Sequence, residues 1–273
     1  MSARGHREYP RFTRSQRVQH WMMVAGFVGL TLTGIPQKYA AHPWGERSIG
    51  LLGGIEMVRL GHRVFAVLLM IATIHHLIDA LHRIGVLRRP LSMLPRYQDV
   101  VDGLQAVRYN LGLAKQRPRM GRFTFEEKVE YWALVWGTVI MIVTGFMLWN
   151  PIATARFFPG QWIPAAQVAH GGEAVLAILA VILWHGYGVH VRHFNRSMFT
   201  GNMSREEMLH EHPLELQAIE EGRLPREPEQ AAVRRRMRVF VPVAAALGAL
   251  LLAGLYWFVT FEQTAIATLP PPG

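Results

Sequence analysis

Five long apolar blocks constrain the fold of this chain more than any other feature of its sequence. They lie near residues 17–38, 55–82, 129–149, 163–191 and 239–261. As a helix, each block is long enough to cross a hydrocarbon core of roughly 30 Å. Because the hydrophobic residues are gathered in this way, the sequence predicts an all-α integral membrane protein, a bundle of transmembrane helices with five spans.

The basic residues indicate how these spans are oriented. Of the 29 Lys and Arg residues, most precede the first block, lie between the second and third, or lie between the fourth and fifth. The opposite connections carry only Lys38 and Arg47, and Arg156. The positive-inside rule therefore predicts a cytoplasmic N-terminus and a C-terminus outside. No basic face with interleaved aromatic residues supports a nucleic-acid partner, so the net charge of +10 reports topology.

The same pattern divides the chain into segments. We expect a basic cytoplasmic arm at 1–16, a four-helix domain at 17–194, a cytoplasmic loop at 195–237, a fifth span at 238–261 and an outer tail at 262–273. In the loop, Ser204 and Glu207 have the spacing of a capping box, which predicts a short helix. His210 and His212 lie among acidic residues there, and we expect a solvated surface segment and no metal site.

Histidines inside the apolar blocks are the strongest functional signal. Six of them lie away from the cytoplasmic ends of the second and fourth blocks, where His82 and His190 stand: His20, His62, His75, His76, His170 and His185. An unpaired imidazole is unfavourable in a bilayer, so a set of this size indicates a bound group. The chain has no cysteine, which excludes thiolate-bound iron–sulfur clusters and covalently attached c-type haem. Any redox centre is therefore held by histidine.

The spacing of these histidines suggests two sites at different depths. At about 100° and 1.5 Å per residue, His62 and His76 share a helix face within roughly 40° and lie about 21 Å apart. His170 and His185 differ by about 60° and roughly 22 Å, whereas His75 points elsewhere, toward a polar neighbour or another helix. Two helices that each offer a histidine at two depths suit two iron porphyrins, each held by two imidazoles. A zinc or copper site would cluster its ligands within a few ångströms.

Four segments carry a resemblance to a known family: RFTRSQRVQHWMMVAGFVGLTLTG, GHRVFAVLLMIATIHHL, GRFTFEEKVEYWALVWGTVIMIVTGFMLWNP and VAHGGEAVLAILAVILWHGYGVH. Over about residues 10–200 the chain resembles the di-haem cytochrome b family, which includes the gamma subunit of formate dehydrogenase and the cytochrome b subunit of nickel–iron hydrogenases. The resemblance implies a four-helix core with two non-covalent b-type haems. It implies that His20 and His185 hold the inner-side haem iron, and that His62 and His170 hold the outer-side one.

The chain departs from the family pattern in three ways. The His170–His185 spacing of 15 is one residue longer than expected, the fifth span lies beyond the four-helix core, and His76 is a further well-placed histidine. His76 and His185 are each seven residues from a flanking arginine, which favours His76 as the inner ligand. The resemblance favours His20, which we take as the ligand, with His76 as its rival.

The resemblance also implies a function and partners. The family passes electrons between a redox partner subunit and membrane quinone, so we expect a subunit of an oxidoreductase complex in a bacterial-type inner membrane. The partner would be an iron–sulfur, cytochrome c or catalytic subunit, and the chain alone would be no complete enzyme. Near the start of the third span, Glu127, Lys128 and Tyr131 are the candidate quinone site. The alternative is a membrane anchor or transporter whose histidines relay protons or bind a metal ion without haem.

Overall fold

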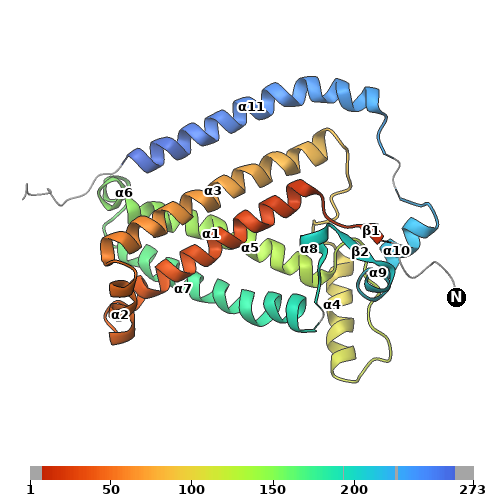
Figure 1. Ribbon diagram of the computed structural model, residues 1–273, viewed down its shortest axis with the longest axis horizontal. Coiled ribbons are helices and arrows are strands. Elements are labelled where there is room, and N and C mark those ends of the chain that lie inside the picture. The colour runs from red at the N-terminus through yellow and green to blue at the C-terminus, as the bar shows by residue number, and fades with distance from the viewer. Residues whose placement is uncertain (1–7, 193, 225–226, 262–273) are drawn as a thin grey trace, which may run out of the picture. The chain divides into compact units, whose positions relative to one another are not determined.

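The computed structural model describes residues 8–192, 194–224 and 227–261 (Figure 1). Residues 1–7 of the predicted arm and the whole predicted tail, 262–273, lie outside these residues. Along the chain the elements are β1 (Glu8–Pro10), α1 (Arg14–Lys38), α2 (Pro43–Leu51), α3 (Ile55–Gly85), α4 (Tyr97–Asn110), α5 (Phe125–Trp149), α6 (Pro151–Phe157), α7 (Trp162–Ala180), the π-helix η2 (Val181–Arg192), α8 (Ser197–Thr200), β2 (Asn202–Ser204), α9 (Arg205–Glu211), α10 (Pro213–Glu220) and α11 (Gln230–Thr260).

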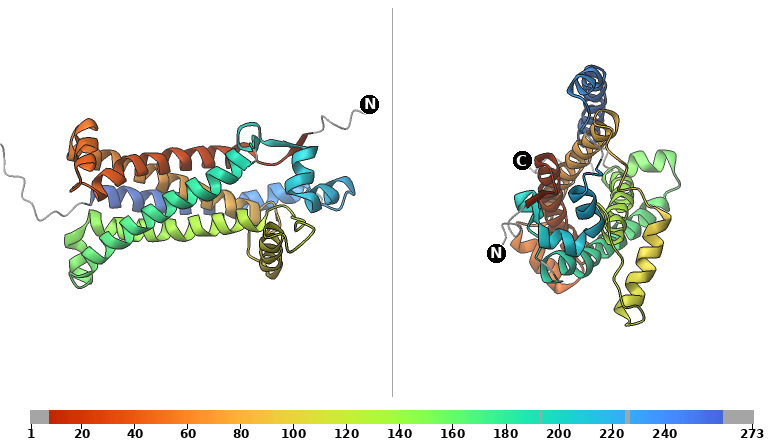
Figure 2. Two further views of the ribbon diagram at one scale, coloured as in Figure 1. Left: turned by 90° about the horizontal axis from the view of Figure 1, so that it is seen from below. Right: turned by 90° about the vertical axis from the view of Figure 1, so that its right-hand side faces the viewer.

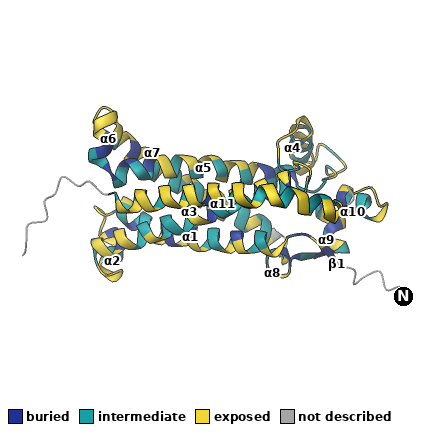
Figure 3. Ribbon diagram, turned by 90° about the horizontal axis from the view of Figure 1, so that it is seen from above, coloured by how far each residue is buried: buried dark blue, intermediate teal, exposed yellow. Residues whose placement is uncertain are grey.

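The five predicted spans are confirmed as long helices. In the described part of the chain, five helices are long and apolar enough to cross a membrane: α1, α3, α5, α7 continued by η2, and α11. No more than 22% of the most apolar stretch of any of them is buried inside the protein (Figure 3). An apolar surface of this extent is suited to lipid. α11 begins at Gln230, ahead of the predicted start of the fifth span, so its first three turns carry the arginines that precede the apolar block.

The chain divides into two compact units, which are described separately. The first unit contains Met1–Trp21, His75–Ala133 and Val189–Ala245. The second contains Met22–Ile74, Leu134–Gly188 and Ala246–Gly273. Each long helix contributes one part to each unit. In the second unit, the segments of α1, α3, α5 and α7 run alongside one another (Figure 2).

The first unit has a small apolar core outside the long helices. β1 pairs with β2 in an antiparallel register that places Tyr9 opposite Met203. Tyr9, Met203, Met208 and Leu216 form a buried cluster beside this pair. The predicted capping box is confirmed at the start of α9, where Ser204 Oγ accepts from the Glu207 amide at 3.2 Å and the Glu207 carboxylate accepts from the Ser204 amide at 2.7 Å.

The expectation that His212 lies on a solvated segment is wrong. His212 is 3% exposed, and its Nδ1 lies 2.9 Å from the carbonyl oxygen of Gly121. It is buried because α10 folds back on the segment before α5, where the Leu214 amide donates to the Met120 carbonyl. Burial lowers the pKa of His212, and the neighbouring Arg11 lowers it further.

The second unit depends on close helix contact. A Cβ atom placed on Gly29 of α1 would overlap the ring of Phe65 on α3. Gly26, one turn earlier, also lies next to α3, and a Cβ atom placed on it would be in contact with Leu69, 3.4 Å from the Leu69 Cβ. Small residues let two membrane helices approach each other closely. This contact between α1 and α3 positions the polar residues described next.

Candidate haem site

His62 of α3 and His170 of α7 lie opposite each other in the second unit. Their ring centroids are 6.3 Å apart and the rings are inclined at 67°. Two imidazoles that bind one metal ion from opposite sides, each through a nitrogen about 2 Å from the metal, have ring centres roughly 6 Å apart. The distance between the two rings therefore leaves room for one metal atom between them.

Two threonines fix the orientation of these rings. Thr33 Oγ1 lies 2.9 Å from His62 Nδ1, and Thr144 Oγ1 lies 2.9 Å from His170 Nδ1. Each hydroxyl donates its own hydrogen to a backbone carbonyl four residues earlier, Gly29 or Ile140. The hydroxyl oxygen must then accept the hydrogen of Nδ1, which assigns the tautomer with a free lone pair on Nε2.

Glycines next to these threonines admit the rings. A Cβ atom on Gly34 would lie 2.9 Å from His62 Cε1, and one on Gly145 would lie 3.4 Å from His170 Cε1. The Thr-Gly dipeptide thus occurs once on α1 and once on α5, each time against a histidine of the following long helix. Sequence reasoning missed Thr33 and Thr144. The repeated dipeptide TG in the first and third apolar blocks is the signal that could have found them.

The helix that carries His170 changes its winding before His185. α7 ends at Ala180, and η2 continues it as a π-helix that contains His185. A π-helix has i→i+5 hydrogen bonds and turns less per residue than an α-helix, so an additional residue fits without rotating the next side chain away. The unusual spacing of 15 residues between His170 and His185 coincides with this π-helix.

His76, in the first unit, is hydrogen-bonded through both ring nitrogens. Its Nδ1 lies 3.0 Å from Gln19 Oε1, and its Nε2 lies 3.0 Å from the hydroxyl of Tyr131. Because an amide oxygen only accepts, Nδ1 carries the hydrogen and Nε2 accepts from Tyr131. His75 points away, with its Nε2 3.3 Å from Ser15 Oγ, which agrees with the polar neighbour expected for it.

The hydrogen bonds behind His76 continue through side chains of α1 and α3. Gln19 Nε2 donates to Ser15 Oγ at 3.1 Å, and Ser15 Oγ donates to Asp79 at 3.0 Å. Asp79 also accepts from Arg83 at 2.6 Å. Such a chain polarises its members and holds His76 in one orientation. His20, also in the first unit, packs edge-on against Trp21 with ring centroids 5.5 Å apart.

The predicted quinone residues make different contacts within the first unit. Tyr131 meets His76, as described. Glu127 pairs with the buried Arg11 at 3.0 Å, and Lys128 pairs with Asp99 of α4 at 2.6 Å. Arg11 is 2% exposed, and its burial lowers the pKa of its guanidinium. Glu127 and Lys128 therefore link α5 to Arg11 and to α4, whereas Tyr131 links α5 to His76.

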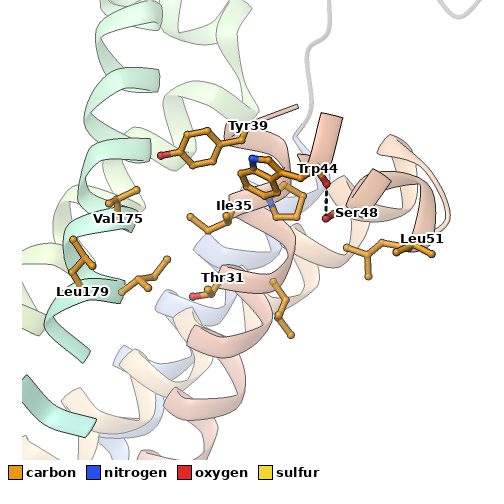
Figure 4. Close-up of a pocket in the computed structure, with 12 residues that line it drawn as sticks. Thr31, Ile35, Tyr39, Trp44, Ser48, Leu51, Val175 and Leu179 are labelled. Carbon is orange, nitrogen blue, oxygen red and sulfur yellow. Dashed lines mark hydrogen bonds between the residues drawn. The ribbon is translucent and has the colours of Figure 1, made fainter. Parts of the chain in front are cut away.

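An apolar groove of about 660 Å³ lies in the second unit, between α1, α2 and α7. Ile35 of α1, Tyr39 just after it, Trp44 of α2, and Val175 and Leu179 of α7 are among its lining residues (Figure 4). None of its lining residues carries a charge at neutral pH, and its hydroxyl groups are those of Thr31, Tyr39 and Ser48. The groove therefore offers mainly apolar contact.

Comparison with known proteins identifies the family. The model of the family described as prokaryotic cytochrome b561 matches residues 9–201, which include His20, His62, His75, His76, His170 and His185. The chain belongs to the prokaryotic cytochrome b561 family. As a cytochrome b of this family it is a multi-pass bacterial membrane protein of electron transport, with b-type haem as its cofactor.

Two characterised relatives are similar to this cytochrome b. One is the cytochrome b556 subunit of the nitrate-inducible formate dehydrogenase of Escherichia coli (strain K12), 22% identical over 214 residues, which is 78% of this chain and 93% of the relative. The other is a second formate dehydrogenase cytochrome b556 subunit of the same strain, 23% identical over 180 residues, or 65% of this chain and 76% of the relative. The resemblance predicted from the sequence is confirmed.

The histidine pair in the second unit fits a haem. Structural zinc needs four protein ligands and catalytic zinc three, and no group of three or more His, Cys, Asp or Glu residues in the described part of the chain could hold a metal ion. A porphyrin supplies four ligands itself and needs only two axial ones. Free Nε2 lone pairs on His62 and His170, at this separation, suit that requirement.

Proposed function

We propose that this cytochrome b carries electrons through two b-type haems, held in residues 17–194, between a redox partner subunit and the membrane quinone pool. The observation that carries the proposal is the pair of opposed histidines, His62 and His170, each with its Nδ1 engaged by a threonine. When bound, a haem with two axial histidines gains and loses one electron and has no open coordination position. The protein therefore leaves bond-making chemistry to its partner.

In this proposal, His62 and His170 hold the outer-side haem. Thr33 and Thr144 act through the histidines, because a ligating histidine that donates its other N–H is fixed in orientation and becomes a better ligand. Gly34 and Gly145 supply the space that these rings occupy. The four side groups come from four different helices, so the site exists only when α1, α3, α5 and α7 are assembled.

We assign the inner-side haem to His20 and His185, with His76 as the rival of His20. The resemblance supports His20. The contacts of His76 support the same choice, because Gln19 and Tyr131 engage both of its ring nitrogens. A ligand needs one nitrogen free for iron. His76 would have to give up its bond from Tyr131 before it could ligate.

His76 and Tyr131 instead fit the polar end of the proposed quinone site. A quinone carbonyl accepts hydrogen bonds, and in this proposal the Tyr131 hydroxyl, at the cytoplasmic end of α5, turns its hydrogen from His76 Nε2 to that carbonyl. Glu127 and Lys128 are the other two residues of the proposed site. Their ion pairs with Arg11 and Asp99 support a role in holding α5 in place.

Substitutions test the quinone site directly. We expect Tyr131→Phe to slow haem reduction by added quinol, since it removes the donor and keeps the ring. Lys128→Ala is expected to have a smaller effect, through the position of α5. Glu127→Gln provides the third test, because it keeps the shape of the side chain. If quinol reduces the haems at the wild-type rate in all three variants, the quinone site lies elsewhere.

The partner and the orientation complete the proposal. The relatives are cytochrome b subunits of formate dehydrogenases, which supports a catalytic or iron–sulfur redox subunit as the partner of this chain. The distribution of basic residues supports an N-terminus in the cytoplasm and a C-terminus outside. Electrons would then cross the bilayer between the partner subunit and a cytoplasmic-side quinone.

Haem content provides the decisive experiment. The purified protein should contain two haems per chain, measured as the pyridine haemochrome against protein concentration. Its reduced-minus-oxidised spectrum should have low-spin bands, and redox titration should resolve two steps. A preparation without Soret absorbance would refute the proposal and favour the proton-relay or transporter alternative. One haem per chain would limit the chain to a single carrier.

A further inference from the structure

Lys38, the last residue of α1, is a cation at the end of an apolar helix. Within the described residues Lys38 makes no ion pair, and its ammonium lies 5.7 Å from the centroid of the Tyr39 ring. It is one of only two basic residues, with Arg47, in the connection between the first two apolar blocks. A lysine at a membrane helix end commonly extends to the interface with water. A lysine that extends toward a neighbouring helix instead has a different role to explain.

The side chain of Lys38 extends across to α7. A Cβ atom placed on Gly171 would lie 2.8 Å from Lys38 Nζ and 3.4 Å from its Cδ. Gly171 directly follows His170. The same helix α1 contacts His62 through Thr33, five residues before Lys38. Helix α1 thus contacts His62 through Thr33 and also places the Lys38 ammonium beside the backbone next to His170.

The other charged groups nearby point elsewhere. Glu173, two residues after Gly171, faces α5, where a Cβ atom on Gly137 would lie 2.6 Å from its Oε1. Arg63, next to His62, lies over the ring of Trp149 with its Cζ 4.6 Å from the centroid. Lys38 is therefore the cation beside His170, and no protein carboxylate of the described chain pairs with it.

A haem held by these histidines would carry two propionate carboxylates at the edge of its porphyrin. A carboxylate at membrane depth needs a charge partner or hydrogen-bond donors, because burying it unpaired is strongly unfavourable. A lysine ammonium supplies three donors and one positive charge. An ammonium that contacts the residue after one axial ligand is well placed for a group at the edge of the porphyrin.

We propose that the Lys38 ammonium pairs with a propionate carboxylate of the haem held by His62 and His170. Gly171 has no side chain, and this leaves room for the ammonium to reach that carboxylate. This inference rests on the proposed haem site. Reduction makes the haem less positive by one charge, so a fixed cation nearby favours the reduced form. Lys38 therefore raises the midpoint potential of this haem above that of the same site without the cation.

Redox titration of the purified protein tests the role of Lys38. The outer haem is first identified as the step that disappears in His62→Ala. We expect Lys38→Met to lower the midpoint of that step and leave the other step unchanged, and Lys38→Arg to keep the midpoint near its original value. Arg47→Gln is the matched control, because it removes the other basic residue of the same connection. It should move neither step.

The outcomes separate this inference from the function on which it rests. Two haems with the outer midpoint unmoved in Lys38→Met would overturn the role of Lys38 and leave the proposed function standing. A wild-type protein without haem would overturn both. Equal shifts of both steps in Lys38→Met, or the same shift in Arg47→Gln, would show a general change of surface charge and also overturn the inference.

Gly171→Ala provides a second variant that keeps the lysine. Its new methyl group would occupy the position 2.8 Å from Nζ, so the flexible end of Lys38 has to move. We expect a smaller decrease of the same midpoint than in Lys38→Met, and no further decrease when the two substitutions are combined. If the two decreases add in full, Lys38 and Gly171 act separately and the pairing is refuted.

Discussion

The histidines of the two units are held in different ways. In the second unit, His62 and His170 each use Nδ1 for a threonine, which leaves a lone pair on Nε2, and their ring centroids are 6.3 Å apart. In the first unit, His76 uses both nitrogens, one toward Gln19 and one toward Tyr131. The residue type is the same in both places, and the hydrogen-bond partners decide what it can do.

This difference separates a ligand from a relay of hydrogen bonds. A threonine hydroxyl that already donates to its own helix can only accept from histidine, which leaves the second nitrogen of the ring open. An amide on one side and a phenol on the other engage the whole ring instead. We therefore expect the second unit to bind metal through histidine and His76 to act through Tyr131.

Removal of a ligand is expected to have the largest effect. His62→Ala or His170→Ala should each lose about one of the two proposed haems, because each variant removes half of the iron ligands that the protein supplies to that haem. Haem per chain and the number of redox steps measure the result. Retention of both haems in both variants would show that His62 and His170 are not haem ligands. The proposed difference between the histidines of the two units would then be wrong.

The next largest effect distinguishes His20 from His76. His20→Ala should lose the low-spin spectrum of the inner haem, whereas His76→Ala should keep that spectrum and slow reduction by quinol. Electron paramagnetic resonance of the oxidised protein reports the ligands, and stopped-flow reduction reports the rate. The opposite result, with the inner haem intact in His20→Ala and lost in His76→Ala, would make His76 the ligand.

Smaller effects are expected from the threonines. Thr33→Val and Thr144→Val keep the side-chain shape and remove the acceptor for Nδ1, and loss of such a partner typically weakens metal binding by roughly 10- to 100-fold. Haem loss to apomyoglobin measures the change. Thr73→Val is the matched control, because Thr73 makes the same bond to a carbonyl four residues earlier, that of Leu69. Equal haem loss in all three would mean that the threonines only support the helices.

The smallest effect concerns the buried His212 of the first unit. Its pKa in the folded protein is lowered from 6.5, so the unfolded chain binds its proton first as the pH falls. Stability should be complete above about pH 6.5 and decrease below it, down to the lowered folded value. Thermal unfolding in detergent should be less sensitive to pH in this range for His212→Gln. An unchanged pH profile in this variant would show that His212 does not contribute to the pH dependence of stability.

The elements that could be predicted from the sequence are those encoded by short, contiguous stretches of residues. Span positions and the capping box at Ser204 follow from local patterns, because an apolar block of this length or a serine before a helix has few other solutions. The family could also be predicted, since its motifs are contiguous. The burial of His212 could not, because it depends on α10 folding back on the segment before α5.

By itself, the sequence determined that this chain is a five-span, histidine-rich membrane protein without thiol chemistry. Its apolar blocks, basic connections and lack of cysteine are independent of how the helices pack. Tertiary structure decided which histidine nitrogens are open. Thr33 meets His62 from 29 residues away and Thr144 meets His170 from 26, while Gln19 and Tyr131 meet at His76 from α1 and α5. Hydrogen bonds of this kind form between side chains distant in sequence, so helix packing alone determines the tautomer and the free lone pair of each ring.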